Sequence, residues 1–360
     1  MMSVTRREFC AAGTALAGLS VLRPGTSIGA ETSAPPTGIG PMDLVDPELR
    51  PVLQAWLKQS PPLVWSEEMV PGIRRKSASQ ALPPLAQPAF VRRTIPGAAG
   101  APDVHIVVIG VTAAGTPRPA VLHIHGGGYV VGTAAESIVP LQRLSAAHGC
   151  VVVSVDYRLA PETRFPGSLE DNYAALRWLH ANAKELGVDG KRIALLGESA
   201  GGGHVAALAI AARDRGEVPV AMQLMLYPML DDRTGSSRAV PSHLGAFVWD
   251  AAANRFGWSS LLGVPAGADS VPSGAVPARV ANLRGLPPTF IGVGSIDLFV
   301  EEDIAYAQRL IQAAVPTELL IAPGGYHGFD ILVPEAKISK RFTAAWNDAL
   351  HRGLNRNVAP

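Results

Sequence analysis

Ser199, Asp297 and His327 have the residue types that nucleophilic catalysis by a serine requires. Ser199 is the centre of a Gly-x-Ser-x-Gly motif, which follows an apolar run and leads into a segment with helical periodicity. In that setting the serine projects from a tight, strained turn, so side chains two residues before and after it would clash. Gly197 and Gly201 stand at those positions. The motif therefore predicts that Ser199 is a nucleophile, although a Gly-rich turn without chemistry would match the same pattern.

A serine hydroxyl attacks slowly unless a neighbouring base takes its proton. His327 is the best placed histidine, because it lies in a Gly-rich loop directly after the last predicted strand, and Asp297 follows the strand before it. In a parallel sheet both positions lie at the edge where the serine turn also lies. The carboxylate of Asp297 would hold the His327 tautomer and stabilise its charged form. Asp297 could instead cap the helix that follows, and Glu301 and Glu302 are rival acids.

A second glycine motif, made of His125, Gly126, Gly127 and Gly128, ends a predicted strand about seventy residues before the serine. Acyl transfer forms a tetrahedral intermediate whose oxyanion needs preorganised donors, and backbone N–H groups can approach it only where side chains are absent. We therefore assign Gly127, Gly128 and Ala200 as the oxyanion donors. His125 is expected to hold the glycine loop by hydrogen bonding, with Gly126 in its support, and not to act on the substrate.

No metal or cofactor is expected. His123 and His125 form a His-x-His pair whose side chains would face one side of a strand, but the sequence shows no carboxylate or third ligand for them. Cys10 and Cys150 have neither metal-ligand nor disulfide spacing. Cys150 begins a Val-rich strand, so we interpret it as a small buried hydrophobe.

The elements that must position these residues alternate between strand-like and helix-like segments. From residue 120 onward the pattern is that of an α/β fold, a mostly parallel sheet covered by helices on both faces. The first two strands have no helix between them and are predicted to enter the sheet antiparallel. A short helix is also predicted over 46–58, capped by Asp46. The predicted strands are 89–94, 104–111, 120–125, 150–156, 192–196, 221–226, 289–293 and 317–321. The predicted helices are 137–147, 169–186, 200–215, 301–314 and 335–352.

Composition supports a large buried core, since 48% of the 360 residues are hydrophobic and 17% are charged. The formal net charge of +1 gives no reason to expect a nucleic-acid partner. No apolar run after the N-terminus reaches the roughly 18 residues that a membrane span needs. The alternation of strands and helices is interrupted by about sixty residues between the predicted strands 221–226 and 289–293, with helix-like pieces over 245–256 and 258–262. An insertion of that length is typical of a lid or cap.

The N-terminus predicts export. Residues 5–10 resemble the twin-arginine motif, with Arg6 and Arg7 followed by Phe9 and a weakly apolar stretch too short for a stable anchor. Cleavage is expected before Glu31, which follows the small residue Ala30. The alternative is a cytoplasmic enzyme with an ordinary Arg-containing N-terminus.

Taken together, the motifs resemble those of the hormone-sensitive-lipase-like esterases. The matching pieces are HGGGY, DYRLAPE, GESAGG, YPMLDDR, the D-x-x-x-E-E stretch from Asp297 and YHGF, in the family's order over about 89–352. Two positions depart from the family pattern: Glu198 stands where Asp is commonest, and Leu298 where Pro often follows the catalytic Asp. In DYRLAPE the expected role is structural, with Asp156 and Arg158 pairing near the serine turn.

The resemblance implies the α/β-hydrolase fold, with an eight-stranded sheet and a helical cap built from the N-terminal region and the insertion. The expected organisation is a signal peptide over 1–30, a linker and N-terminal cap segment over 31–88, and a catalytic domain over 89–355 whose cap insertion is about 231–285. It also implies hydrolysis of carboxylic esters of short to medium acyl chains, through an acyl-enzyme and without a cofactor.

The expected partner is a small-molecule acyl ester, and a homodimer is left open. An amide, lactone, carbamate or polysaccharide acetyl group is an alternative substrate, because the same triad serves all of them. A non-catalytic ligand receptor on this fold is the alternative from another class. It would be expected to have lost a triad member, and here none is lost.

Overall fold

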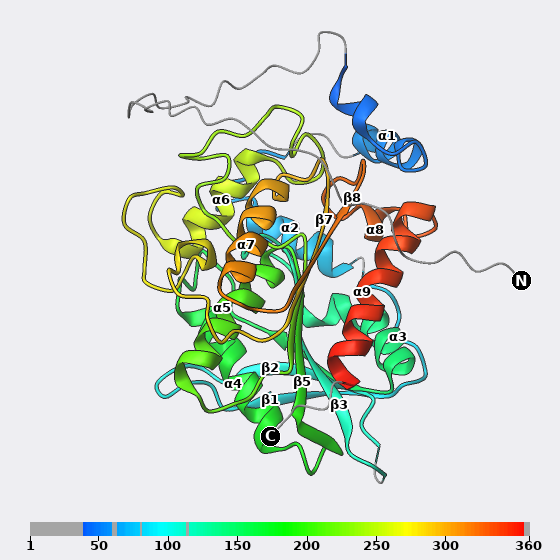
Figure 1. The fold of residues 1–360 in the computed structure, drawn as a ribbon, viewed down its shortest axis with the longest axis vertical. Coiled ribbons are helices and arrows are strands. Elements are labelled where there is room, and N and C mark those ends of the chain that lie inside the picture. The colour runs from blue at the N-terminus through cyan, green and yellow to red at the C-terminus, as the bar shows by residue number, and fades with distance from the viewer. Residues whose placement is uncertain (1–38, 60–62, 80, 113–114, 356–360) are drawn as a thin grey trace, which may run out of the picture. The chain divides into compact units, whose positions relative to one another are not determined.

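The computed structural model describes residues 39–59, 63–79, 81–112 and 115–355. These residues contain one sheet of eight strands in the order β1-β2-β4-β3-β5-β6-β7-β8 (Figure 1). β1 pairs with β2 and β2 with β4 antiparallel, and all the pairs that follow are parallel. The strands are β1 (Phe90–Ile95), β2 (Val104–Ile109), β3 (Arg118–Ile124), β4 (Val151–Asp156), β5 (Val188–Glu198), β6 (Met222–Leu226), β7 (Thr289–Gly294) and β8 (Thr317–Ala322). All eight predicted strands, the antiparallel entry and the α/β fold class are confirmed.

Helices cover both faces of this sheet. One face packs against α4, α5 and α7, and the other against α3 and α9, so that each face has its own apolar core (Figure 1). This is the arrangement that consecutive apolar residues in the parallel strands require, because both of their faces must be buried. The helices are α1 (Arg50–Gln59), α2 (Val70–Ser79), α3 (Ile138–His148), α4 (Gly167–Ala181), α5 (Ala200–Arg215), α6 (Ala251–Leu262), α7 (Val300–Gln312), α8 (Phe329–Leu332) and α9 (Lys337–Asn355).

Helix α5, which follows the serine, is buried along most of its length and consists mainly of Gly and Ala near its start. These small residues let the helix approach its neighbours closely. A Cβ on Gly203 would lie 2.2 Å from the Met229 carbonyl oxygen, and one on Gly202 would lie 2.8 Å from Pro228 Cβ. The glycines are therefore needed to seat the start of α5 against the chain that leaves β6.

Several predicted helices differ in detail from the observed ones. The predicted helix 46–58 begins only at Arg50, and Asp46 accepts a hydrogen bond from the Glu48 amide instead of capping the helix. The predicted helix 169–186 ends at Ala181, where irregular turns lead into β5. In the insertion the two helix-like pieces form one helix, α6, capped by Asp250. Helix α2 was missed, because its Pro and Gly obscure the helical period.

The expected signal peptide and the first residues of the expected linker lie outside the described residues, so cleavage and export stay predictions. Cys10 lies there as well, whereas Cys150 is fully buried as predicted, and burial raises its pKa to about 12. Among the helices described, none combines the length and apolar character that crossing a membrane would need.

Candidate active site

The turn that carries Ser199 connects β5 to α5 and is strained, as the motif predicts. Ser199 has φ 56° and ψ −122°, a conformation that costs energy for any residue with a side chain. The turn is held by hydrogen bonds from the Ser199 amide to the Leu226 carbonyl at 2.9 Å and from the Met229 amide to the Ser199 carbonyl at 3.0 Å. A Cβ on Gly197 would lie 2.4 Å from the Gly201 carbonyl oxygen, and one on Gly201 would lie 2.0 Å from that of Ile124. Only glycine fits at these two positions.

The structure brings Ser199, His327 and Asp297 together from three loops at the carboxyl edge of the sheet. The Ser199 hydroxyl lies 3.0 Å from His327 Nε2, and His327 Nδ1 lies 2.9 Å from Asp297 Oδ2. The second carboxylate oxygen of Asp297 accepts the Phe299 amide at 3.0 Å, which fixes the carboxylate plane. Asp297 is fully buried, and Ser199 and His327 are each 8% exposed. The rival Glu301 is exposed, and Glu302 contacts the Leu230 and Asp231 amides instead of His327.

The glycine loop after β3 lies against the serine turn. A Cβ on Gly126 would lie 2.9 Å from the Glu198 carbonyl oxygen and 3.4 Å from Ser199 Cβ. In the part of the chain that the structure describes, the amides of Gly127, Gly128 and Ala200 have no hydrogen-bond acceptor of their own. Three free N–H groups next to the serine are what an oxyanion requires.

His125 lies behind this loop. Its Nδ1 is 2.8 Å from the Gly126 carbonyl oxygen, the loop contact expected from the sequence. Its ring stacks on Tyr157 with centroids 4.3 Å apart, and the Tyr157 hydroxyl donates to the His125 carbonyl at 2.9 Å. Burial lowers the pKa of His125 to about 4, so the ring is neutral at pH 7.

Glu198, the residue before Ser199, contacts a histidine for which the sequence showed no carboxylate partner. His123 Nε2 lies 3.1 Å from Glu198 Oε2, and His123 Nδ1 lies 2.9 Å from the Ser154 hydroxyl. The interpretation of His123 and His125 as a pair lacking any carboxylate was therefore wrong for His123. The residues described include no group of three or more His, Cys, Asp or Glu placed to hold a metal ion.

The expected pair between Asp156 and Arg158 does not form. Arg158 instead binds Asp171 of α4 with two nitrogens, its Nε and one terminal nitrogen, both at 2.8 Å. Asp156 accepts the Ala134 amide at 2.8 Å. Asp156 is the last residue of β4, whereas Arg158 lies beyond the end of the strand, where the regular alternation of side chains no longer holds. Asp171 was the closer partner in space, although it lies 13 residues further along the chain.

Aromatic side chains enclose Ser199, His327 and Asp297, and most of them belong to no motif. Tyr227 and Phe299 meet the His327 ring edge to face, with centroids 4.9 Å and 5.3 Å away. The indole of Trp249, from the insertion, lies 6.4 Å from the same ring and is itself contacted by Trp65 at 5.6 Å. Tyr227 begins the YPMLDDR motif, but its contact with His327 was not predicted, and the other three aromatic residues were missed because aromatic residues in loops have no characteristic spacing.

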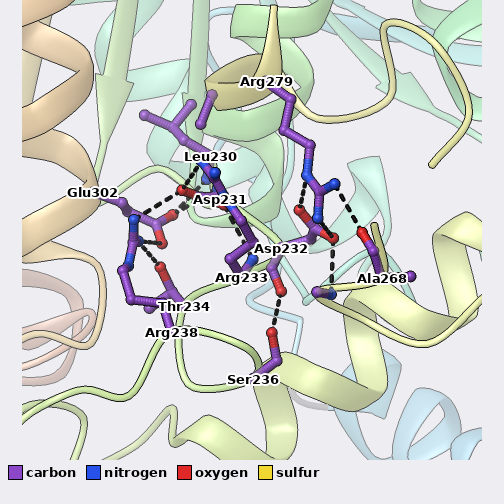
Figure 2. Close-up of polar contacts among 12 residues, drawn as sticks. Leu230, Asp231, Asp232, Arg233, Thr234, Ser236, Arg238, Ala268, Arg279 and Glu302 are labelled. Atoms are coloured by element: carbon purple, nitrogen blue, oxygen red, sulfur yellow. Dashed lines mark hydrogen bonds and ion pairs between the residues drawn. The ribbon is translucent and has the colours of Figure 1, made fainter. Parts of the chain in front are cut away.

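Ion pairs tie the insertion to the rest of the fold (Figure 2). Asp232 is fully buried and binds Arg279 through both carboxylate oxygens at 2.7 Å and 2.8 Å. Asp231 binds Arg233 and Arg238, and Glu302 of α7 accepts the Leu230 and Asp231 amides at 2.6 Å and 3.1 Å. Burial raises the pKa of Glu302 to about 8. These contacts join the start of the insertion to its end and to the helix that follows Asp297.

The N-terminal segment is fastened to the same edge by Arg74 of α2. Its guanidinium donates to the Val130 and Ala160 carbonyls at 2.8 Å and 2.9 Å and pairs with Glu162. Val130 follows the glycine loop, so α2 and Trp65 before it are held over the site. The arrangement as a whole can activate a serine, stabilise an oxyanion and exclude water, which is the requirement for acyl transfer.

Comparison with known proteins agrees with this geometry. A family model described as the α/β hydrolase fold matches residues 121–331. The carboxylesterase NlhH of Mycobacterium tuberculosis is 35% identical over 321 residues, which cover 85% of this chain and 97% of that protein. A bacterial heroin esterase superposes with a TM-score of 0.78 at 37% identity, covering 88% of this chain and 99% of that chain. The esterase LipW from Mycobacterium marinum has a TM-score of 0.72 at 36% identity, covering 88% and 98%.

Proposed function

The chain belongs to the α/β-hydrolase fold family and is a carboxylic-ester hydrolase, and we propose that it acts through an acyl-enzyme formed on Ser199. The observation that carries the proposal is the continuous contact from the Ser199 hydroxyl through His327 to Asp297, with both links at hydrogen-bond distance. The printed names of its relatives, carboxylesterase and esterase, support the reaction type.

In the proposed mechanism His327 Nε2 takes the proton of the Ser199 hydroxyl as its oxygen attacks the ester carbonyl carbon. The carbonyl oxygen becomes an oxyanion, which the amides of Gly127, Gly128 and Ala200 stabilise. His327 then gives the proton to the departing alcohol oxygen. Water, activated by the same histidine, attacks the acyl-serine and regenerates the hydroxyl. Asp297 stabilises the charged imidazolium throughout.

The substrate that we propose is a small ester with a short to medium acyl chain. The triad is buried under aromatic side chains, and Ser199 and His327 are each 8% exposed. A site enclosed in this way favours compact substrates that can be surrounded, because a long chain would need an open path to solvent.

The test is the hydrolysis of 4-nitrophenyl acetate, butyrate and palmitate by the purified protein and its Ser199→Ala variant. We expect acetate and butyrate to be cleaved faster than palmitate, and the variant to lose on the order of 10⁶-fold in kcat. Equal turnover by Ser199→Ala would refute the mechanism, whereas a preference for palmitate would refute only the size of the substrate.

We also propose that residues 1–30 direct export by the twin-arginine route, on the strength of the paired Arg6 and Arg7 and the short apolar stretch after them. Fractionation of cells that produce the full chain tests this. Normal export of a variant in which both arginines are lysine would contradict the proposed route.

A further inference from the structure

Trp249 belongs to none of the sequence motifs, yet its side chain packs against the glycine loop and lies near His327. A Cβ on Gly128 would lie 2.2 Å from Trp249 Cη2 and 2.8 Å from Cζ2, so the benzo edge of the indole is packed on the backbone of a proposed oxyanion donor. The same ring is 6.4 Å from the His327 ring. Trp249 is only 7% exposed. Its indole therefore bounds the space in which an ester carbonyl would lie.

The backbone directly before Trp249 is strained. The preceding residue, Val248, has φ 68°, a left-handed conformation that is rare and costly for a β-branched residue. Val248 is 41% exposed, so the side chain makes little contact that would explain this conformation. The Trp249 amide donates to the Phe247 carbonyl at 2.8 Å, which closes a tight turn around Val248 and sets the direction in which the chain enters Trp249.

The loop before Trp249 is also attached to the loop that carries the catalytic acid. The Gly245 amide donates to the Ile296 carbonyl at 3.1 Å, one residue before Asp297. A Cβ on Gly245 would lie 2.8 Å from the Leu298 side chain. These contacts attach the Trp249 loop to the loop of Asp297, so the indole forms a fixed boundary of the site.

Further aromatic side chains pack behind the indole of Trp249. Trp65 meets Trp249 edge to face at 5.6 Å and stacks with Phe256 of α6 at 5.8 Å. Helix α6 is itself pressed on the glycine loop, because a Cβ on Gly257 would lie 2.5 Å from the Gly128 carbonyl oxygen. The indole therefore has little room to move away when a longer substrate enters.

We propose that Trp249 determines the acyl-chain specificity of this enzyme by closing the acyl side of the site. The inference rests on the proposed function. In the acyl-enzyme mechanism the leaving oxygen faces His327 Nε2, while the carbonyl oxygen faces the glycine amides. The indole packs on the backbone of Gly128, on the carbonyl side, so we assign its bulk to the acyl substituent and not to the alcohol. The substrates that fit are esters of small acids such as acetate and butyrate.

The experiment measures kcat/KM for 4-nitrophenyl acetate, butyrate, hexanoate and octanoate with the wild type, Trp249→Phe and Trp249→Ala. Removing the indole should raise the ratio of octanoate to acetate by at least about tenfold, since each methylene accommodated in an apolar pocket contributes roughly that factor. Trp249→Phe should give an intermediate ratio. A ratio unchanged within twofold in both variants would overturn the proposal.

Two controls separate this role from general loosening of the fold. Trp178→Ala makes the same chemical change on α4, where the ring contacts Arg93 of β1, and should leave the ratio at its wild-type value. A series of ethyl, butyl and octyl acetates should show no comparable shift in Trp249→Ala, and a shift confined to that series would overturn the assignment to the acyl side. If Trp249→Ala does not fold, Trp249→Leu replaces it in the same comparison.

Failure of this proposal and failure of the proposed function give different results. A wild type that hydrolyses no ester, or a Ser199→Ala variant that hydrolyses esters as fast as the wild type, would refute the function itself. Retained hydrolysis by the wild type with an unaltered chain-length profile in the Trp249 variants would refute only the role of Trp249.

Discussion

The loops at the carboxyl edge of the sheet and the insertion between β6 and β7 meet over the same serine but are built by different means. At the sheet edge, glycines allow backbones to approach so closely that a Cβ would overlap a carbonyl oxygen, as at Gly197 and Gly201. In the insertion, contacts between side chains hold the chain in place: Asp232 binds Arg279, and Trp249 packs against Trp65. The proposed chemistry thus depends on backbone geometry, whereas the enclosure of the site depends on side-chain contacts.

Backbone strain occurs in both regions and is concentrated at the site. Five non-glycine residues in the described chain have positive φ, and four of them lie at the site: Tyr129 follows the glycine loop, Ser199 is the proposed nucleophile, Tyr227 contacts His327, and Val248 precedes Trp249. The fifth, Ala314, lies between α7 and β8. Strained residues persist only where the surrounding structure holds them. Their gathering here indicates that both regions are shaped around the reacting groups, although only the sheet edge would supply those groups.

The largest effect that separates the two regions is expected from Asp297→Asn. The asparagine amide would favour the wrong His327 tautomer and could not stabilise the imidazolium, so kcat should fall on the order of 10⁴-fold with the fold unchanged. Steady-state kinetics with 4-nitrophenyl acetate and a thermal melt measure the two quantities. Because Asp297 is fully buried, a water molecule cannot take over the role of the missing carboxylate in the variant.

Glu301→Gln is the matched control, because this rival acid is exposed one turn further along the chain. Its kcat should stay within about twofold of the wild type, as expected for a surface change. A loss of kcat in Glu301→Gln as large as that in Asp297→Asn would mean that Asp297 is not the catalytic acid. The sheet edge would then not supply all of the reacting groups.

The sheet edge could be predicted from the sequence for the same reason that it is rigid. Glycine is required wherever backbones touch, so the serine turn and the run from Gly126 to Gly128 appear as motifs. The strands were also predictable, because consecutive apolar residues such as Val151–Val153 must be buried on both sides. The triad members were predictable from their position just after strands, and the structure brings the three within hydrogen-bond distance.

The insertion and the N-terminal segment were not predictable in the same way. Arg74 binds Glu162 across 88 residues and Asp232 binds Arg279 across 47, and no local pattern marks either partner. The mistaken pairing of Asp156 with Arg158 has the same cause, because proximity in sequence suggested a contact, whereas the partner of Arg158 is Asp171, 13 residues further along the chain. Trp249 was missed because its role depends on where the loop meets Gly128, which only the assembled fold determines.

The second effect concerns stability and should be confined to the insertion. Asp232→Ala leaves Arg279, whose side chain is only 19% exposed, without its carboxylate, and should lower the free energy of unfolding by about 3 kcal/mol. Chemical denaturation followed by tryptophan fluorescence measures the change. Glu335→Ala, which breaks an exposed pair with Lys340, should leave the denaturation midpoint unchanged. Equal midpoints for the two variants would show that side-chain pairs do not hold the insertion.

The smallest effect is a pH dependence of stability expected from a histidine behind the glycine loop. His204 of α5 is buried between Tyr129 and Tyr157, with centroids 4.8 Å and 4.7 Å away, and faces His125. Burial lowers the pKa of His204 to about 3, from 6.5 in the unfolded chain. Between these values the unfolded chain binds a proton that the folded chain does not, so this stability is complete above pH 6.5 and is lost as the pH falls toward 3.

His204→Phe keeps the ring and removes the titration. Its melting temperature should therefore fall less between pH 7 and pH 4.5 than that of the wild type, by on the order of 5 °C. His351→Phe, at an exposed position near the end of α9, is the matched control and should follow the wild type. Asp232→Ala should also keep the wild-type slope, since its ion pair lies in the other region. An identical slope in His204→Phe would mean that the acid sensitivity arises from other groups, and that the burial of His204 does not produce it.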